Sequence, residues 1–97
     1  MTILANPSHP GEVLEELYLV PLQMSAGALA RRLGVPRTRI ERLVKGETGV
    51  TADTALRLAA FFGNSAEMWM NLQRAHDLAA ARRAIDVSGI VPLEQAA

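Results

Sequence analysis

The stretch that decides the fold reads SAGALARRLGVPRTRIERLVK and occupies residues 25–45. Within it, Ala30, Gly34 and Ile40 have the spacing that is typical of two short helices joined by a tight turn. A small side chain at Ala30 lets the helices cross closely, and Gly34 adopts the left-handed backbone of the turn. Ile40 anchors the second helix in the core. These three residues predict a helix-turn-helix unit.

Capping and linking residues predict where the two helices begin and end. Ser25 is a good N-cap, and the helix that it begins covers about residues 26–33. Val35 and Pro36 form a short link to a second helix over about residues 37–45. On a helical wheel, the apolar residues of this second helix gather on one side, so its other side is exposed and polar.

The exposed side of the second helix suits the major groove of DNA. Arginine pairs with guanine through two hydrogen bonds, and threonine reaches a base edge or a thymine methyl group. The predicted base contacts are Thr38, Arg39 and Arg42. The predicted contacts to the DNA backbone are Ser25, Arg31, Arg32, Arg37, Lys45 and Thr48.

The charge pattern agrees with this interpretation. The chain of 97 residues has a net charge of zero, but residues 25–45 hold six basic residues against one acidic residue. Both flanking parts are net acidic. An arginine-rich helix face often consists only of solvated charges. Here the charge lies on the one helix that the turn spacing independently marks, which favours binding to a polyanion.

The rest of the chain also has helical periodicity. His9 or Ser8 is the expected cap of a first helix that Pro21 ends. Further helices are expected over residues 52–62 and from about residue 66 to about residue 83. We therefore predict an all-α fold, a five-helix bundle that forms one DNA-binding domain over residues 1–84. A tail over residues 85–97, which fits a short strand and an irregular segment equally well, could contribute to dimerisation.

Several classes of function are disfavoured. The chain has no cysteine, and its two histidines, His9 and His76, are far apart in sequence, so we expect no metal site and no cofactor. No pair of carboxylates, phosphate-binding loop or nucleophile motif predicts an enzyme. No apolar run reaches the roughly 18–20 residues that span a bilayer. The opening residues do not resemble a signal peptide, so we expect a soluble cytoplasmic protein.

Four blocks in order resemble the HigA antitoxin family, within the Xre class of lambda-repressor-like regulators. The blocks are His9-Pro10-Gly11-Glu12, Val35-Pro36-Arg37-Thr38-Arg39-Ile40, Gly49-Val50-Thr51-Ala52-Asp53-Thr54-Ala55-Leu56-Arg57-Leu58-Ala59 and Trp69-Met70-Asn71-Leu72-Gln73. The resemblance implies a homodimer that binds palindromic operator DNA and represses its own toxin–antitoxin operon. It also implies neutralisation of a HigB-type toxin that cleaves messenger RNA. The alternative is a stand-alone Xre-type repressor without a toxin partner.

Two positions depart from the pattern that the resemblance implies. Ala26 stands where phage-repressor helices usually have a glutamine that helps to hold a phosphate. Glu47 makes the loop after the second helix acidic, although this loop is often basic in the family. Loop contacts to DNA therefore depend on Thr48 or on backbone amides.

Two further surfaces have alternative interpretations. Met68, Trp69 and Leu72 fit either core packing or a dimer interface, in which tryptophan and methionine are enriched. Glu12, Glu15 and Glu16 fit either a solvated helix face or a docking surface for a basic toxin.

Overall fold

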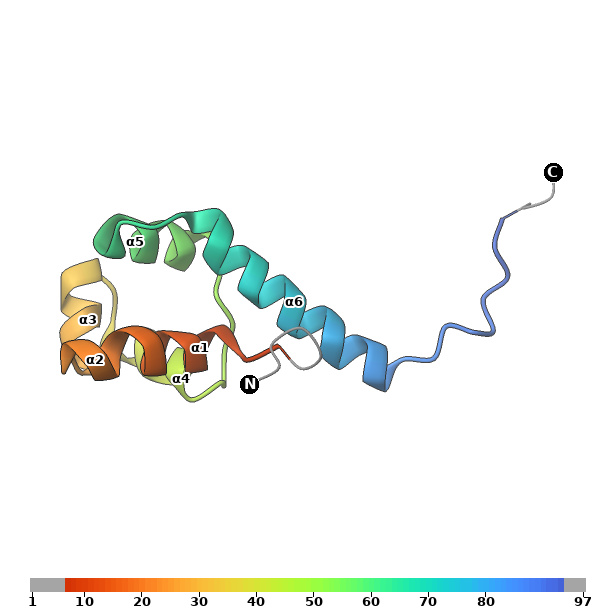
Figure 1. Cartoon of the computed structure of the whole chain (residues 1–97), viewed down its shortest axis with the longest axis horizontal. Coiled ribbons are helices and arrows are strands. Elements are labelled where there is room, and N and C mark those ends of the chain that lie inside the picture. The colour runs from red at the N-terminus through yellow and green to blue at the C-terminus, as the bar shows by residue number, and fades with distance from the viewer. Residues whose placement is uncertain (1–6, 94–97) are drawn as a thin grey trace.

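The computed structural model describes residues 7–93, which form an all-α fold of five helices (Figure 1). The first helix consists of three consecutive parts, and the other four are single elements. The bounds are α1 Pro10–Leu14, η1 Glu15–Leu19, α2 Val20–Leu22, α3 Ala26–Leu33, α4 Arg37–Val44, α5 Ala52–Phe62 and α6 Ala66–Ala84.

The first helix begins as its sequence predicts and continues past its proline. The side chain of His9 accepts a hydrogen bond from the backbone N–H of Gly11, and Pro10 occupies the first helical turn. The helix widens to π geometry through η1, and Pro21 lies inside α2 instead of ending the helix. A proline lacks the N–H that an α-helix uses, and in π geometry the bonds run from residue i to i−5. The helix ends instead at Gln23, which has a left-handed backbone.

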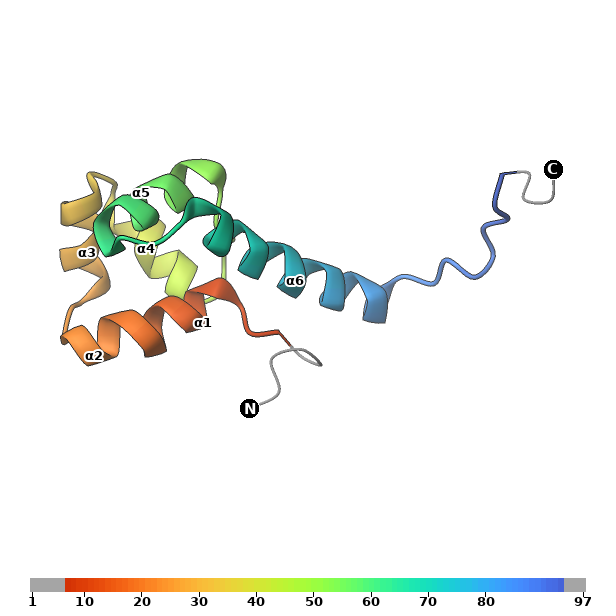
Figure 2. The same ribbon diagram turned by 45° about the horizontal axis from the view of Figure 1, so that its top comes forward.

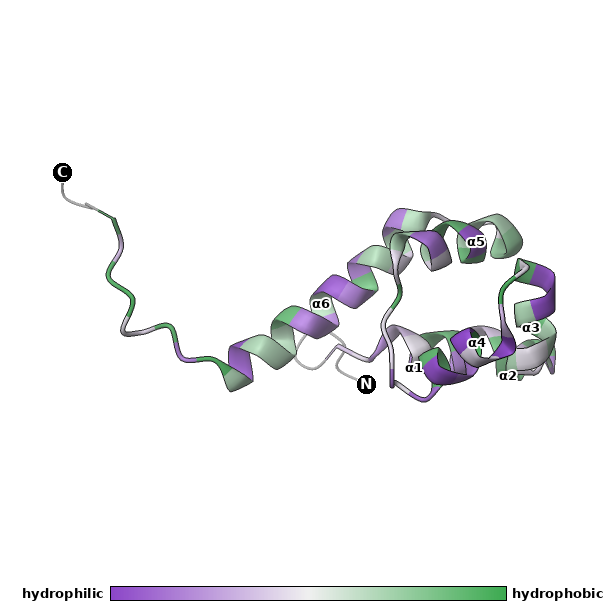
Figure 3. Ribbon diagram, turned by 180° about the vertical axis from the view of Figure 1, so that it is seen from behind, coloured by the Kyte–Doolittle hydropathy of each residue, from purple (hydrophilic) through white to green (hydrophobic). Residues whose placement is uncertain are grey.

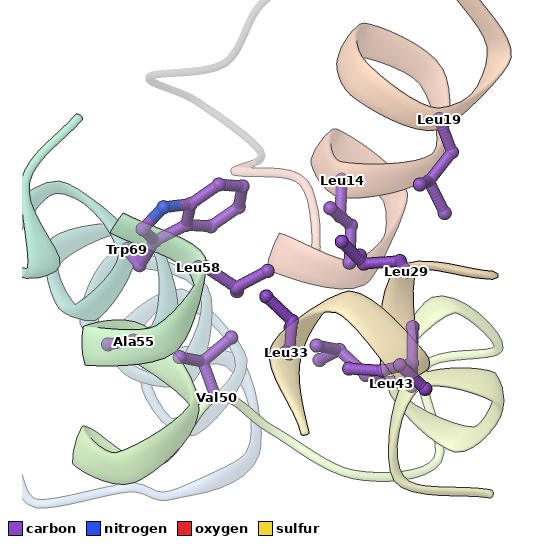
Figure 4. Packing of buried hydrophobic residues seen from close by; sticks show 11 residues of the cluster. Leu14, Leu19, Leu29, Leu33, Leu43, Val50, Ala55, Leu58 and Trp69 are labelled. Carbon is purple, nitrogen blue, oxygen red and sulfur yellow. The ribbon is translucent and has the colours of Figure 1, made fainter. Parts of the chain in front are cut away.

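A single apolar core lies between the helices (Figure 4). Leu14 from α1 meets Leu29 from α3, Leu43 from α4 and Leu58 from α5 in it. Trp69 is completely buried, and its indole N–H donates to the side chain of Asn64. Within the described residues, no buried side-chain polar atom lacks a hydrogen-bond partner.

Only the first part of α6 packs on this core. Its remainder leaves the bundle and points away from it, so the molecule measures 56 Å along its long axis but about 25 Å across (Figures 1 and 2). Residues 85–93 continue outward without forming a strand, so of the two alternatives for this part of the tail the irregular segment is correct. Residues 94–97 of the predicted tail lie outside the described part. Within residues 7–93, no helix is long and apolar enough to cross a membrane.

Candidate nucleic-acid interface

The helix-turn-helix consists of α3, its turn and α4. Gly34 has a φ of 74°, which is the left-handed conformation that glycine adopts without steric cost. The backbone N–H of Val35 donates to the carbonyl of Ala30 at 3.1 Å and closes the turn. Ala30 and Ile40 are both buried. The three residues that define the motif in the sequence therefore hold α3 and α4 against each other and against the core.

The exposed side of α4 borders a hollow of about 480 Å³ between this helix, the loop that follows it and the start of α5. Three predicted base contacts, Thr38, Arg39 and Arg42, line this hollow together with the predicted backbone contact Thr48. Thr51 and Asp53 of the next segment line it as well. The structure thus brings the predicted base-reading residues to one concave surface.

Each arginine of α4 is paired with a carboxylate in the unbound chain. Arg37 pairs with Glu41 at 3.3 Å, and the Nε of Arg42 lies 3.6 Å from a carboxylate oxygen of Glu47. Glu47 therefore partly neutralises the arginine on the predicted reading face. These two pairs are exposed to solvent, so they contribute little to stability and separate readily when a phosphate or a base competes.

Arg39 belongs to a set of linked hydrogen bonds. Its Nη1 donates to Oδ1 of Asp53 at 2.7 Å, and the Nε of Arg57 donates to the same oxygen at 2.8 Å. Arg57 in turn donates from Nη1 to the carbonyl oxygen of Leu33 at 2.7 Å. The hydrogen bonds from Arg57 and then from Arg39 hold the pKa of the Asp53 carboxyl below its usual value, so this group is ionised at neutral pH.

Sequence reasoning did not identify Asp53 and Arg57 as part of the site. Their spacing of four residues on one helix is a signal for an ion pair, because side chains at i and i+4 are neighbours. Nothing in the local sequence indicates that Arg39, fourteen positions earlier, joins the same oxygen.

The other predicted contacts to the DNA backbone are more dispersed. The hydroxyl of Ser25 caps α3 by accepting from the N–H of Ala28 at 3.0 Å. The guanidinium of Arg32 lies 5.0 Å from the centre of the Phe61 ring, in a cation–π contact. Arg31 is exposed at the end of α3. Lys45 lies away from the base-reading hollow, at the C-terminal end of α4.

The acidic residues gather in a second hollow. Glu12, Glu15 and Glu16 line it together with Lys45 and His9. Among the described residues, none of these three glutamates forms an ion pair, and no cluster of three or more metal-ligating side chains is present.

The predicted dimer residues lie at different depths. Trp69 is fully buried in the core of its own chain, so it has no surface to offer a second copy, and the prediction of a dimer contact is wrong for this residue. Met68 and Leu72 are half-buried against the core. Leu72 also lines an apolar groove of about 410 Å³ along α6, together with Ala75 and Leu78.

Comparisons with known proteins agree with this geometry. The profile of the helix-turn-helix family matches residues 14–69. Virulence-associated protein I of Dichelobacter nodosus is 48% identical over 88 residues, which cover 88% of this chain and 80% of the relative. The structure also resembles two solved structures.

The first solved structure is an addiction module antidote protein of a HigA family from Coxiella burnetii. It is 42% identical, with a TM-score of 0.82 and coverage of 90% of this chain and 97% of that chain. The second is the Pseudomonas aeruginosa antitoxin HigA with the higBA promoter. It is 39% identical, with a TM-score of 0.80 and coverage of 91% of this chain and 99% of that chain.

Proposed function

Because the chain belongs to the HigA family of Xre-type helix-turn-helix antitoxins, which are not enzymes, we propose that it binds operator DNA through α4 and represses its own operon. The observation that carries this proposal is the hollow in which Thr38, Arg39 and Arg42 meet. A recognition helix enters the major groove with its N-terminal residues toward the base edges. Thr38 and Arg39 occupy that part of α4, and Arg42 lies in its last turn. The solved structure of the relative with the higBA promoter supports binding to operator DNA.

The second half of the proposed function is neutralisation of a HigB-type toxin in the cytoplasm. Within residues 7–93 the glutamates Glu12, Glu15 and Glu16 form no ion pair, and this acidic cluster suits a basic partner that itself binds RNA. Leu17 and Val20 are exposed on the same helical segment, with 65% and 60% of their surface accessible. Acidic and apolar side chains side by side favour a protein partner over a purely solvated face.

The protein acts in this proposal as a homodimer, since a palindrome offers two equivalent half-sites about one DNA turn apart. The free part of α6 supports this. Leu78, which lines the apolar groove together with Leu72, is 43% exposed, and Ile85 and Val87 are about 60% exposed just beyond the helix. Figure 3 shows hydrophobic stretches along the end of α6 and the segment that follows it. We assign the dimer contact to this part of α6 and to the adjoining tail.

The test combines DNA binding with growth. Binding to DNA from upstream of its own gene is compared with binding to a shuffled sequence of equal length. Arg42→Ala is expected to weaken operator binding by about 1–3 kcal/mol, since it removes a base contact. Asn71→Ala, at an exposed position on the first part of α6, serves as the control and leaves binding unchanged.

In the growth arm, the short reading frame beside the gene is expressed alone, with the wild type, and with the double variant Arg39→Ala/Arg42→Ala. We expect arrest by the neighbour and rescue by both versions, because the acidic cluster is apart from the DNA-reading hollow. A harmless neighbour, together with intact operator binding, would instead identify a stand-alone repressor. Equal binding to operator and shuffled DNA would refute sequence-specific recognition.

A further inference from the structure

A chain of hydrogen bonds connects the turn of the helix-turn-helix to a base-reading side chain. It runs from the carbonyl of Leu33 through Arg57 and Asp53 to Arg39, with donor–acceptor distances of 2.7, 2.8 and 2.7 Å. Leu33 ends α3, Asp53 and Arg57 lie on α5, and Arg39 lies on α4. Three helices are therefore linked at the edge of the proposed DNA surface.

Stabilisation of the fold alone is a weak explanation for this arrangement. The side chains of Arg39, Asp53 and Arg57 keep 41%, 55% and 42% of their surface accessible, and exposed ion pairs contribute little to stability. The helices are already held together by the buried core. The geometry is more specific than a surface ion pair requires. The Nε of Arg57 donates to Asp53 and its Nη1 donates to the carbonyl of Leu33, so the Asp53 oxygen is fixed relative to the turn.

The position of Asp53 also lowers the affinity that is expected for DNA of any sequence. Its carboxylate lines the same hollow as Thr38 and Arg42, where a phosphate backbone approaches. A negative charge there repels phosphates and lowers affinity for DNA of any sequence. The carboxylate occupies one N–H of Arg39, and an arginine guanidinium has five such donors, so the others remain available for a base.

We propose that Asp53 and Arg57 are specificity-determining positioning residues, which hold Arg39 in the orientation that reads a base and keep it from binding phosphates of non-operator DNA. This proposal rests on the operator recognition proposed above. An unrestrained arginine reaches phosphates in many orientations, whereas the tethered one pairs well only where a guanine presents its two acceptors in the correct position.

The experiment measures dissociation constants for the operator and for shuffled DNA, and takes their ratio. Asp53→Asn removes one negative charge from the surface, and Arg57→Gln removes one positive charge. Charge alone would move general affinity in opposite directions for the two variants. Our proposal predicts that the ratio falls in both, by about fivefold or more, since a good bidentate base contact contributes at least that much discrimination.

Glu41→Gln is the matched control. It removes a carboxylate from α4, where Glu41 pairs with Arg37, a predicted contact to the DNA backbone and not to a base. We expect it to strengthen binding to both DNAs by the same factor and to leave the ratio unchanged. Urea unfolding midpoints are measured for each variant. If Arg57→Gln does not fold, the specificity ratios of Asp53→Asn and Glu41→Gln are compared instead.

A second readout separates positioning from a structural role. Arg39→Ala identifies the base pair at which Arg39 acts, as the position where discrimination is lost. In Asp53→Asn, we expect discrimination to fall at that base pair and to persist at the others. A uniform loss of discrimination at all base pairs would overturn the proposal. So would equal changes in the dissociation constants for operator and shuffled DNA. If the wild type itself does not distinguish operator from shuffled DNA, the proposed function fails instead.

Discussion

At the scale of single residues, Gly11 lies where the first helix packs tightly against the backbone of the recognition helix. A Cβ atom at this position would collide with the carbonyl oxygen of Leu43 and lie 2.7 Å from its carbonyl carbon. Both are backbone atoms, which cannot rotate away as the end of a side chain can. The glycine in the block His9-Pro10-Gly11-Glu12 is therefore required by the packing of α1 on α4.

Gly11→Ala should accordingly destabilise the protein by about 1–3 kcal/mol, because an overpacked contact forces the two helices apart. The free energy of unfolding in urea measures this effect. Gly27→Ala is the control, since its new methyl group meets only the flexible side chain of Arg37, 2.9 Å away. We expect that variant to be neutral or slightly more stable, as alanine favours a helix. Equal stability of the two variants would contradict the role assigned to Gly11.

At the scale of elements, the helices are delimited by their caps and tied together by a few polar contacts. The hydroxyls of Ser25, Thr51 and Ser65 each accept a hydrogen bond from an N–H in the first turn of the helix that follows. The side chain of Gln73 on α6 accepts from the backbone N–H of Val50 at 2.6 Å, which fixes the loop before α5. The caps are local, whereas the Gln73 contact exists only because α6 packs beside that loop.

The first helix has a cap that depends on pH. The Nδ1 atom of His9 accepts from the N–H of Gly11 at 2.9 Å, which requires this nitrogen to be unprotonated. Burial lowers the pKa of His9 below its usual value, and the neighbouring His76, whose ring lies 5.0 Å away, lowers it further. A hydrogen bond to the backbone of Thr48 partly opposes this shift of the pKa.

The stability contribution of His9 is therefore complete above the unfolded-state pKa of about 6.5 and declines as the pH falls from there through the lower folded-state pKa. His9→Asn keeps a side chain that caps helices well but does not titrate. We expect the wild type to lose more unfolding free energy than this variant between pH 7.5 and pH 5, measured in urea. Parallel curves for the two proteins would show that His9 does not titrate in this manner.

At the scale of the whole molecule, the compact bundle and the projecting part of α6 have different surfaces. The bundle buries most of its large apolar side chains and exposes a few, such as Leu17 and Leu56. In the described part beyond α6 the apolar side chains are all exposed, and Ile90 and Val91 reach 71% and 86%. Soluble proteins rarely leave contiguous apolar surface exposed without a partner. This contrast is the reason for placing the proposed dimer contact on the projecting part.

Leu78→Asp is expected to convert the dimer to a monomer, because it places a charge beside the apolar groove. Sedimentation equilibrium over a range of protein concentrations measures the change. Leu17→Asp alters an equally apolar exposed residue on η1 and should leave the dimer intact. Persistence of the dimer in Leu78→Asp, or a wild type that is monomeric at every concentration, would contradict the assignment.

The sequence by itself determined the all-α class, the limits of α3, α4 and α5 to within one residue, and the exposed basic face of α4. These features depend on short-range physics: a capping hydroxyl, a glycine in the left-handed turn, and apolar residues at helical spacing. The same local reasoning failed at Pro21, where π geometry lets the helix continue.

Only the tertiary structure decided which long-range partners meet. Periodicity places Trp69 on an apolar helix face but does not say whether its own core or a second copy covers that face, and the packing shows its own core. The contacts of Arg57 with Leu33 and of Asp53 with Arg39 join residues 24 and 14 positions apart. Such pairs form because packed helices bring distant residues together, and no local pattern of sequence encodes that distance.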